Sequence, residues 1–190
     1  MKRFPIGCQT ITFGERQRYH FDEIFPALSE AGYDGVEIGF RHIRETPPER
    51  LRTMLEAHGL ELAATHVGGN LFDTSGASTE KNELDRVLDY VSAIGTTIVL
   101  YSGLSFKNDA QFSADFGSLR CAADLCRERG IRLLYHNHDF EFSEDWRIMR
   151  AIMREPSTNL GLCPDLGWVY RSGADVIRFL EEAHELIEAV

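Results

Sequence analysis

The stretch LLYHNHDFEF at residues 133–142 joins a short apolar run directly to two histidines, an aspartate and a glutamate. A short apolar run followed by ionisable side chains is typical of a buried parallel strand whose carboxyl end carries a functional site. Alternation along an extended strand places His136 and His138 on the same face. The polar residues therefore cap the strand, form a hydrogen-bonded buried cluster, or hold a metal ion.

Five further apolar runs have a similar length, and stretches with helical periodicity separate them. The starts of successive runs are about 30 residues apart, which is the length of one βα unit. Glycines that suit helix C-termini precede several of the runs. The last helical face includes Val176 and Val190, so we expect the final helix to reach the end of the sequence. We expect strands at residues 5–13, 35–39, 61–67, 96–102, 131–139 and 159–165.

This alternation of strands and helices predicts an α/β fold with a parallel sheet. A doubly wound nucleotide-binding sheet is disfavoured, because the first turn, TFGERQRYH at residues 12–20, lacks a glycine-rich phosphate-binding motif. Polar residues at the carboxyl ends of several strands favour a (β/α)8 TIM barrel. Such a barrel takes about 250 residues. We therefore expect this chain of 190 residues to hold only the first six βα units, with strands 7 and 8 missing.

Composition restricts the class of protein. The formal net charge of −10 disfavours a nucleic acid or an anionic membrane surface as the main partner, since both select basic patches. No segment resembles a signal peptide or a membrane span, and the four cysteines form no CxxC pair, so we expect a soluble cytoplasmic protein with reduced cysteines. No linker or low-complexity tract interrupts the chain, so residues 1–190 are expected to form a single domain.

The ionisable residues after the fifth apolar run allow two interpretations. His136 and His138 either converge on a site inside the barrel or are interior histidines with satisfied hydrogen bonds. Glu141 either lies in a solvated loop or belongs to a site close to His138. The second interpretation is favoured because Phe140 and Phe142 flank this glutamate with bulk that would order the loop and lower the local dielectric.

Four more candidates lie at the ends of other expected strands. Glu37 and His66 are either ordinary hydrogen-bonded residues or parts of a site at the carboxyl end of a barrel. Asp165 either caps the following turn or binds a ligand. Trp168 either packs in the core or forms an aromatic floor under a sugar ring.

Four segments carry a resemblance to a known family: GYDGVEIG (32–39), THVGG (65–69), YHNHDFEF (135–142) and GLCPDLGWVYRSGAD (161–175). Over essentially its whole length the chain resembles the xylose isomerase-like superfamily of sugar phosphate isomerases and epimerases, in particular the branch with inosose dehydratase-like proteins. The resemblance implies a (β/α)8 barrel with one divalent metal ion. Manganese is expected first, with magnesium, cobalt and zinc as alternatives. The implied substrate is a small sugar, sugar phosphate or keto-polyol.

Carried over position by position, the resemblance implies Glu141 and Asp165 as metal ligands, with His138 and His136 either bound to the ion or next to its ligands. It implies Glu141, His138 and His66 as groups that polarise the substrate or transfer protons. The pocket that binds the substrate is implied to include Glu37, His66, His136 and Trp168.

A divalent ion in such a site acts as a Lewis acid on a sugar. It stabilises the enediolate that forms when the carbon next to the carbonyl, which carries a hydroxyl, loses its carbon-bound proton. Return of the proton to the neighbouring carbon gives isomerisation, and return to the opposite face gives epimerisation. Loss of a β-hydroxyl gives dehydration, and the sequence does not choose among the three. The DNA-cleaving branch of the superfamily is disfavoured, because Asp165-Leu-Gly-Trp168 replaces its Asp-x-x-His pattern.

The family continues into a seventh strand with a histidine ligand and an eighth with a carboxylate, and the sequence shows neither. An incomplete ligand set holds a hard divalent ion weakly, with waters in the remaining positions. We therefore expect either a truncated product of a longer gene or a short form whose open strand edges are covered by a second copy of the chain. The alternative to an enzyme is a catalytically degenerate barrel fragment that binds a sugar or a partner.

Overall fold

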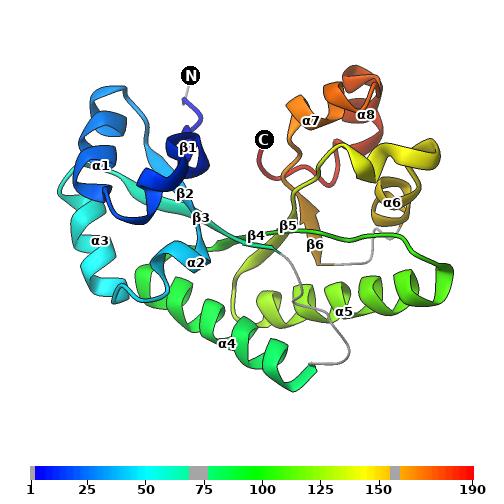
Figure 1. Ribbon diagram of the computed structural model, residues 1–190, viewed down its shortest axis with the longest axis horizontal. Coiled ribbons are helices and arrows are strands. Elements are labelled where there is room, and N and C mark those ends of the chain that lie inside the picture. Colours follow the sequence, from blue (N-terminus) through cyan, green and yellow to red (C-terminus); the bar gives the residue numbers. More distant parts are fainter. Residues whose placement is uncertain (1–2, 69–76, 155–158) are drawn as a thin grey trace. The chain divides into compact units, whose positions relative to one another are not determined.

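The computed structural model describes residues 3–68, 77–154 and 159–190 (Figure 1). Within these ranges, six strands form one sheet whose order follows the chain from β1 to β6. Parallel registers pair β1 with β2, β2 with β3 and β5 with β6, and helices connect the strands. These repeated βα units confirm the expected TIM-barrel-like α/β fold. The strands are β1 (Gly7–Gln9), β2 (Gly35–Gly39), β3 (Glu61–Gly68), β4 (Ile98–Ser102), β5 (Arg132–Tyr135) and β6 (Leu160–Leu162). The helices are η1 (Thr10–Arg18), α1 (Phe21–Glu30), α2 (Phe40–Ile43), α3 (Pro48–Glu56), α4 (Ala77–Ile94), α5 (Asp109–Glu128), η3 (Phe140–Phe142), α6 (Ser143–Met153), α7 (Leu166–Arg171) and α8 (Val176–Ala183).

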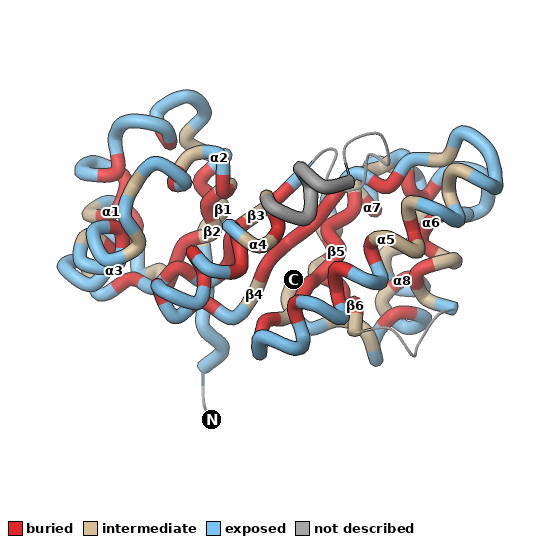
Figure 2. Tube along the Cα trace, turned by 90° about the horizontal axis from the view of Figure 1, so that it is seen from below, coloured by how far each residue is buried: buried red, intermediate tan, exposed pale blue. Residues whose placement is uncertain are grey.

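Packing divides the chain into two compact units, and the expected single domain remains a prediction. Unit 1 comprises Met1–Val67 and Asp85–Val99, and unit 2 comprises Gly68–Leu84 and Leu100–Val190. The core of unit 1 contains side chains from β2, α1 and α3, whereas that of unit 2 contains side chains from β5, α5 and α8. Helix α5 packs along β5 (Figure 1), and Figure 2 shows β5 as a buried strand. Fully buried residues include Phe25, Val36, Ile38 and Leu51 in unit 1 and Leu119, Leu133, Tyr135 and Phe179 in unit 2.

Glycine ends several helices, as the sequence predicts. Gly59 and Gly130 follow α3 and α5 with φ values of 66° and 72°. Glycine adopts this left-handed conformation without the penalty that a Cβ atom brings, and the next strand starts directly afterwards. Within the described ranges, the helices lack the length and hydrophobicity that a bilayer span requires.

Three strands end earlier than the sequence suggests, because polar side chains replace the backbone ladder at their ends. The expected strand at residues 5–13 ends at Gln9, and η1 follows, where the Thr10 hydroxyl donates to the carbonyl of Glu37 at 3.1 Å. The strand expected to reach residue 139 ends at Tyr135. There the amide of Asn137 bonds to the backbone of the segment after β6, which likewise ends at Leu162 rather than at residue 165.

The expectation that the final helix reaches the end of the sequence is wrong. Helix α8 ends at Ala183, and the chain then becomes extended beside β6. The Leu162 N–H donates to the carbonyl of Leu186 at 2.7 Å, and the Glu188 N–H donates to the carbonyl of Leu162 at 3.0 Å. Ile187 thereby forms a parallel bridge with Leu162. The outer edge of β6 offers backbone groups that need partners, so the residues around Ile187 pair with it instead of continuing the helix.

A side chain at Gly161 in β6 would force its neighbours Leu134 and Glu188 to move. A Cβ atom there would lie 2.6 Å from Leu134 Cδ2 and 2.6 Å from Glu188 Oε1. We expect Gly161→Ala to lower the free energy of unfolding by about 1–3 kcal/mol through overpacking, measured by urea denaturation. Gly117→Ala is the control, because a Cβ at Gly117 meets nothing within 4 Å and alanine favours the helix. Equal stability of the two variants would contradict the packing of residues 186–188 against β6.

Candidate active site

The side-chain amide of Asn137 connects the segments that follow the carboxyl ends of β5 and β6 in unit 2. Asn137 is 1% exposed. Its Oδ1 accepts from the Asp165 N–H at 3.1 Å, and its Nδ2 donates to the Asp165 carbonyl at 3.2 Å. This two-bond clamp fixes the backbone of Asp165 next to the loop that carries His136 and His138. Sequence reasoning did not single out Asn137, although its position between two histidines was the available signal.

Asp165 acts as a helix cap, as one of its two interpretations requires. It is the N-cap of α7, and its Oδ1 accepts from the Trp168 N–H at 3.0 Å. The second carboxylate oxygen, Oδ2, has no hydrogen-bond donor in the part of the chain that the structure describes. Capping therefore occupies one oxygen and leaves the other for a ligand, so the two interpretations of Asp165 are compatible.

His136 is buried and electrostatically coupled to Asp165. Its exposed fraction is 9%. Burial lowers the pKa of His136, and this effect is opposed by the negative charge of Asp165. A lowered pKa keeps the imidazole neutral near pH 7, with one ring nitrogen carrying a lone pair. A neutral imidazole and a carboxylate with an available oxygen are side chains of the kind that bind divalent metal ions.

Glu141 is fully buried, so a solvated-loop position is excluded. Its Oε1 accepts from the Tyr135 hydroxyl at 2.8 Å, and its Oε2 accepts from the His138 N–H at 2.8 Å. Burial raises the pKa of Glu141, although the two hydrogen bonds oppose this effect. Both oxygens already accept bonds from protein groups. The implied role of Glu141 as a metal ligand remains a prediction, and this geometry favours a supporting role instead.

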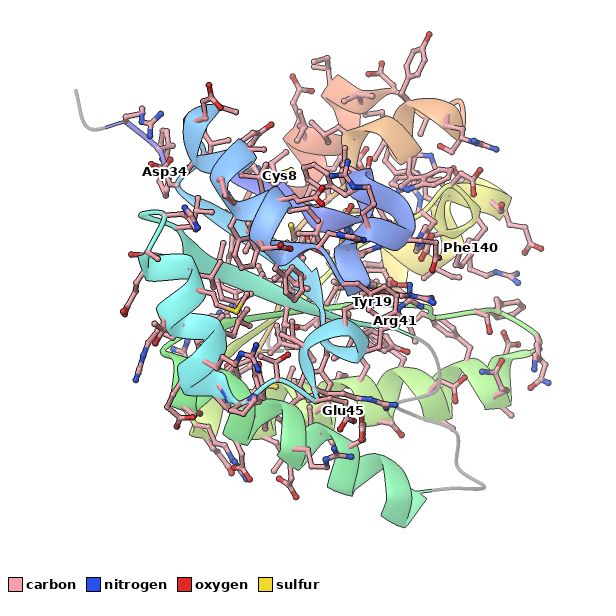
Figure 3. The ribbon with its side chains drawn as sticks, turned by 60° about the vertical axis from the view of Figure 1, so that its left-hand side comes forward. Cys8, Tyr19, Asp34, Arg41, Glu45 and Phe140 are labelled. Atoms are coloured by element: carbon pink, nitrogen blue, oxygen red, sulfur yellow. The ribbon has the colours of Figure 1, made fainter. Side chains whose placement is uncertain are left out.

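The ring of His138 lies within an aromatic cluster. Its centroid is 5.7 Å from that of Phe140, in a stacked geometry, and 5.6 Å from that of Trp168. The ring of His136 lies 5.4 Å away at an angle of 86°. Phe140, labelled in Figure 3, is 42% exposed, so the cluster reaches the protein surface. The Nδ1 atom of His138 is buried, has no hydrogen-bond partner in the described part of the chain, and lies 3.9 Å from Glu141 Oε1.

The predicted residues Glu37 and His66 belong to unit 1. Glu37 lies in β2, and its Oε1 accepts from Gln9 Nε2 at 2.9 Å. His66 lies near the end of β3, where its backbone pairs with Gly39. Both side chains are half-buried. The predicted residues thus form two groups, Glu37 and His66 in unit 1 and the others in unit 2, and Gln9 is a polar partner that sequence reasoning missed.

No group of three or more histidine, cysteine, aspartate or glutamate side chains in the described ranges is arranged to hold a metal ion. The donor pair of His136 and Asp165 is smaller than this. A divalent ion bound there needs water or substrate oxygens for its remaining positions.

Comparison with known proteins identifies the class of protein. The family model for the xylose isomerase-like TIM barrel matches residues 25–190, and the chain belongs to this family.

Particular relatives are similar over most of the chain. An inosose dehydratase from Geobacillus kaustophilus is 26% identical, and the match covers 98% of this chain and 68% of the relative. A solved sugar phosphate isomerase/epimerase from Parabacteroides distasonis has a TM-score of 0.82 at 17% identity, covering 99% of this chain and 74% of its own. A xylose isomerase-like TIM barrel protein from Mycobacterium smegmatis, solved in complex with magnesium, has a TM-score of 0.73 at 18% identity. The match covers 96% of this chain and 71% of that protein. The two solved structures share the fold with this chain.

Proposed function

We propose that this chain acts as a divalent-metal-dependent enzyme that removes a proton next to the carbonyl of a sugar, sugar phosphate or keto-polyol. The observation that carries the proposal is that Asp165 and the buried His136, which interact electrostatically, follow the carboxyl ends of the adjacent strands β6 and β5. The Asn137 clamp fixes the backbone of this pair before any ligand binds. Pre-ordered polar groups at this end of a TIM-like sheet are typical of an active site.

The donor chemistry fits a divalent ion. A carboxylate oxygen and a neutral imidazole nitrogen suit manganese, zinc and related ions, and the magnesium complex of the Mycobacterium smegmatis neighbour supports a divalent ion in this family. We propose that His136 and Asp165 hold the ion in unit 2, in place of the pair of Glu141 and Asp165 implied by sequence resemblance. Once bound, a divalent ion polarises a carbonyl as a Lewis acid.

We assign the remaining residues of unit 2 by their contacts. His138 takes and returns the proton through the exposed part of its ring, while its buried Nδ1 has no hydrogen-bond partner among the described residues. Trp168 packs against His138 and offers an aromatic face to the apolar side of a sugar ring. A substrate-binding role for Glu37 and His66, which belong to unit 1, remains a prediction.

The reaction type is tested by product analysis. The inosose dehydratase relative supports a keto-polyol substrate, and the solved isomerase/epimerase supports a sugar phosphate. The chain with Mn²⁺ is incubated with keto-inositols, ketohexoses and their phosphates, and products are identified by NMR. We expect one class to be converted only when metal is present. Binding of these compounds without conversion would instead favour the alternative, a sugar-binding module.

A further inference from the structure

We propose that Glu141 is a positioning residue that, together with Tyr135, holds the ring of His138 in place through a buried chain of hydrogen bonds. The geometric part of this inference concerns unit 2 alone. It rests on the proposed function only where it treats His138 as the group that transfers the proton.

Three hydrogen bonds make up this buried network. The Leu104 N–H donates to the Tyr135 hydroxyl oxygen at 3.1 Å, and this hydroxyl donates to Glu141 Oε1 at 2.8 Å. The His138 N–H donates to Glu141 Oε2 at 2.8 Å. Leu104 is 1% exposed, whereas Tyr135 and Glu141 are 0% exposed. Water is therefore excluded from a path that joins the loop after β4, strand β5 and helix η3 to the backbone of His138.

These bonds restrict the backbone from which the His138 ring projects. The carboxylate of Glu141 accepts from the buried Tyr135 hydroxyl on one side and from the His138 N–H on the other. Phe140 stacks on the His138 ring at an interplanar angle of 11°. The ring therefore contacts Phe140 while the backbone N–H of His138 is bonded to Glu141. Burial and the charge of Glu141 raise the pKa of Tyr135 well above its ordinary value, so the hydroxyl remains a donor.

A ligand role for Glu141 explains this arrangement less well. A metal ligand needs a lone pair directed at the ion, whereas both oxygens of Glu141 point at protein donors in a fully buried place. A buried carboxylate without such donors is costly, since desolvation disfavours its charge. The two donors are therefore sufficient to explain why a glutamate occupies this position.

Two substitutions break different links of the chain. Tyr135→Phe keeps the aromatic ring and its packing but removes the hydroxyl, which leaves Leu104 N–H and Glu141 Oε1 without partners. Glu141→Gln keeps the shape of the side chain, but an amide has one acceptor oxygen and cannot accept both bonds. The matched control is Tyr90→Phe in unit 1, which removes another buried hydroxyl that donates to the Thr46 carbonyl at 2.9 Å.

The readout is the NMR signal of the His138 ring, assigned by its loss in His138→Gln. Stacked aromatic neighbours shift this signal away from that of an exposed histidine. We expect both Tyr135→Phe and Glu141→Gln to move it toward the exposed position, and Tyr90→Phe to leave it unchanged. Calorimetry with Mn²⁺ is the second readout. Glu141→Gln is expected to keep the affinity of the wild type, whereas Asp165→Ala is expected to lose it.

Two results would overturn the proposal. The first is an unmoved His138 signal in both variants, which would mean that the chain of hydrogen bonds does not position the ring. The second is a loss of Mn²⁺ affinity in Glu141→Gln as large as in Asp165→Ala, which would make Glu141 a ligand. If the wild type binds no Mn²⁺, the proposed function fails, while the NMR signal still tests the positioning because it requires neither metal nor substrate.

Discussion

Replacing Asp165 with alanine is expected to lower the affinity of the chain for Mn²⁺ by about tenfold or more, because it removes one of the two proposed donors. The same change removes the side-chain cap of α7, whose oxygen accepts from the Trp168 N–H at 3.0 Å. Loss of an N-cap lowers the free energy of unfolding by about 1 kcal/mol. Titration calorimetry measures the first effect, and urea denaturation measures the second.

Asp175→Ala separates the two effects. Asp175 is the N-cap of α8, and its Oδ1 accepts from the N–H groups of Ile177 and Arg178 at 3.0 and 3.1 Å. The control variant therefore loses a cap of the same kind, at a position that we do not assign to the metal. We expect it to lose similar stability and to keep the affinity for Mn²⁺. An equal loss of affinity in both variants would contradict a direct role for Asp165.

Replacing Phe179 with alanine is expected to lower the free energy of unfolding by about 3–5 kcal/mol. Phe179 lies in α8 and is 0% exposed. Its ring lies 5.2 Å from that of Phe142 and 6.1 Å from that of Trp146, so it packs α8 against the segment that contains Glu141. Truncation leaves a cavity between these elements, and urea denaturation gives the change in stability.

Ile177→Ala is the control for this loss. Ile177 lies in the same helix but is 64% exposed, so alanine there removes little buried surface. We expect a change within about 0.5 kcal/mol, as for most surface positions. A small change in Phe179→Ala, comparable with that in Ile177→Ala, would show that α8 does not contribute to the core of unit 2.

The starts of the strands were predictable from the sequence, whereas several ends were not. The run at Gly35–Gly39 matches β2 residue for residue, because apolar side chains and flanking glycines mark both of its ends. At β5, alternation along the sequence predicts a strand up to residue 139, but the strand ends at Tyr135. The partner of Asn137 that ends it lies 28 residues away, at Asp165. Periodicity within a strand carries no information about such a distant hydrogen bond.

The end of α8 was missed for a similar reason. The helical face could be read from Val176 onward, and the structure shows Asp175 as the N-cap of this helix. The backbone partner that draws Ile187 out of the helix is Leu162 in β6, which no local pattern reveals. The last residues therefore cover part of the strand edge that was expected to be open.

The candidate site was predictable as a set of residues but not in its internal roles. The sequence placed Glu141 close to His138, and the two are hydrogen-bonded. Of the two phenylalanines expected to flank Glu141, Phe142 is 6% exposed, whereas Phe140 is 42% exposed and stacks on His138. The hydroxyl of Tyr135 was not anticipated as a partner of Glu141, because an apolar strand run gives no sign that its last residue turns a polar group toward a carboxylate.

The measurement that tests the central claim most directly is deuterium incorporation from solvent into a keto-sugar or keto-inositol, followed by NMR in ²H₂O. Removal of the proton next to the carbonyl precedes isomerisation, epimerisation and dehydration alike, so exchange reports the common step. We expect incorporation that requires Mn²⁺ and falls strongly in Asp165→Ala but not in Asp175→Ala. A folded chain that binds Mn²⁺ and shows no incorporation with any of these substrates would contradict the proposed activity.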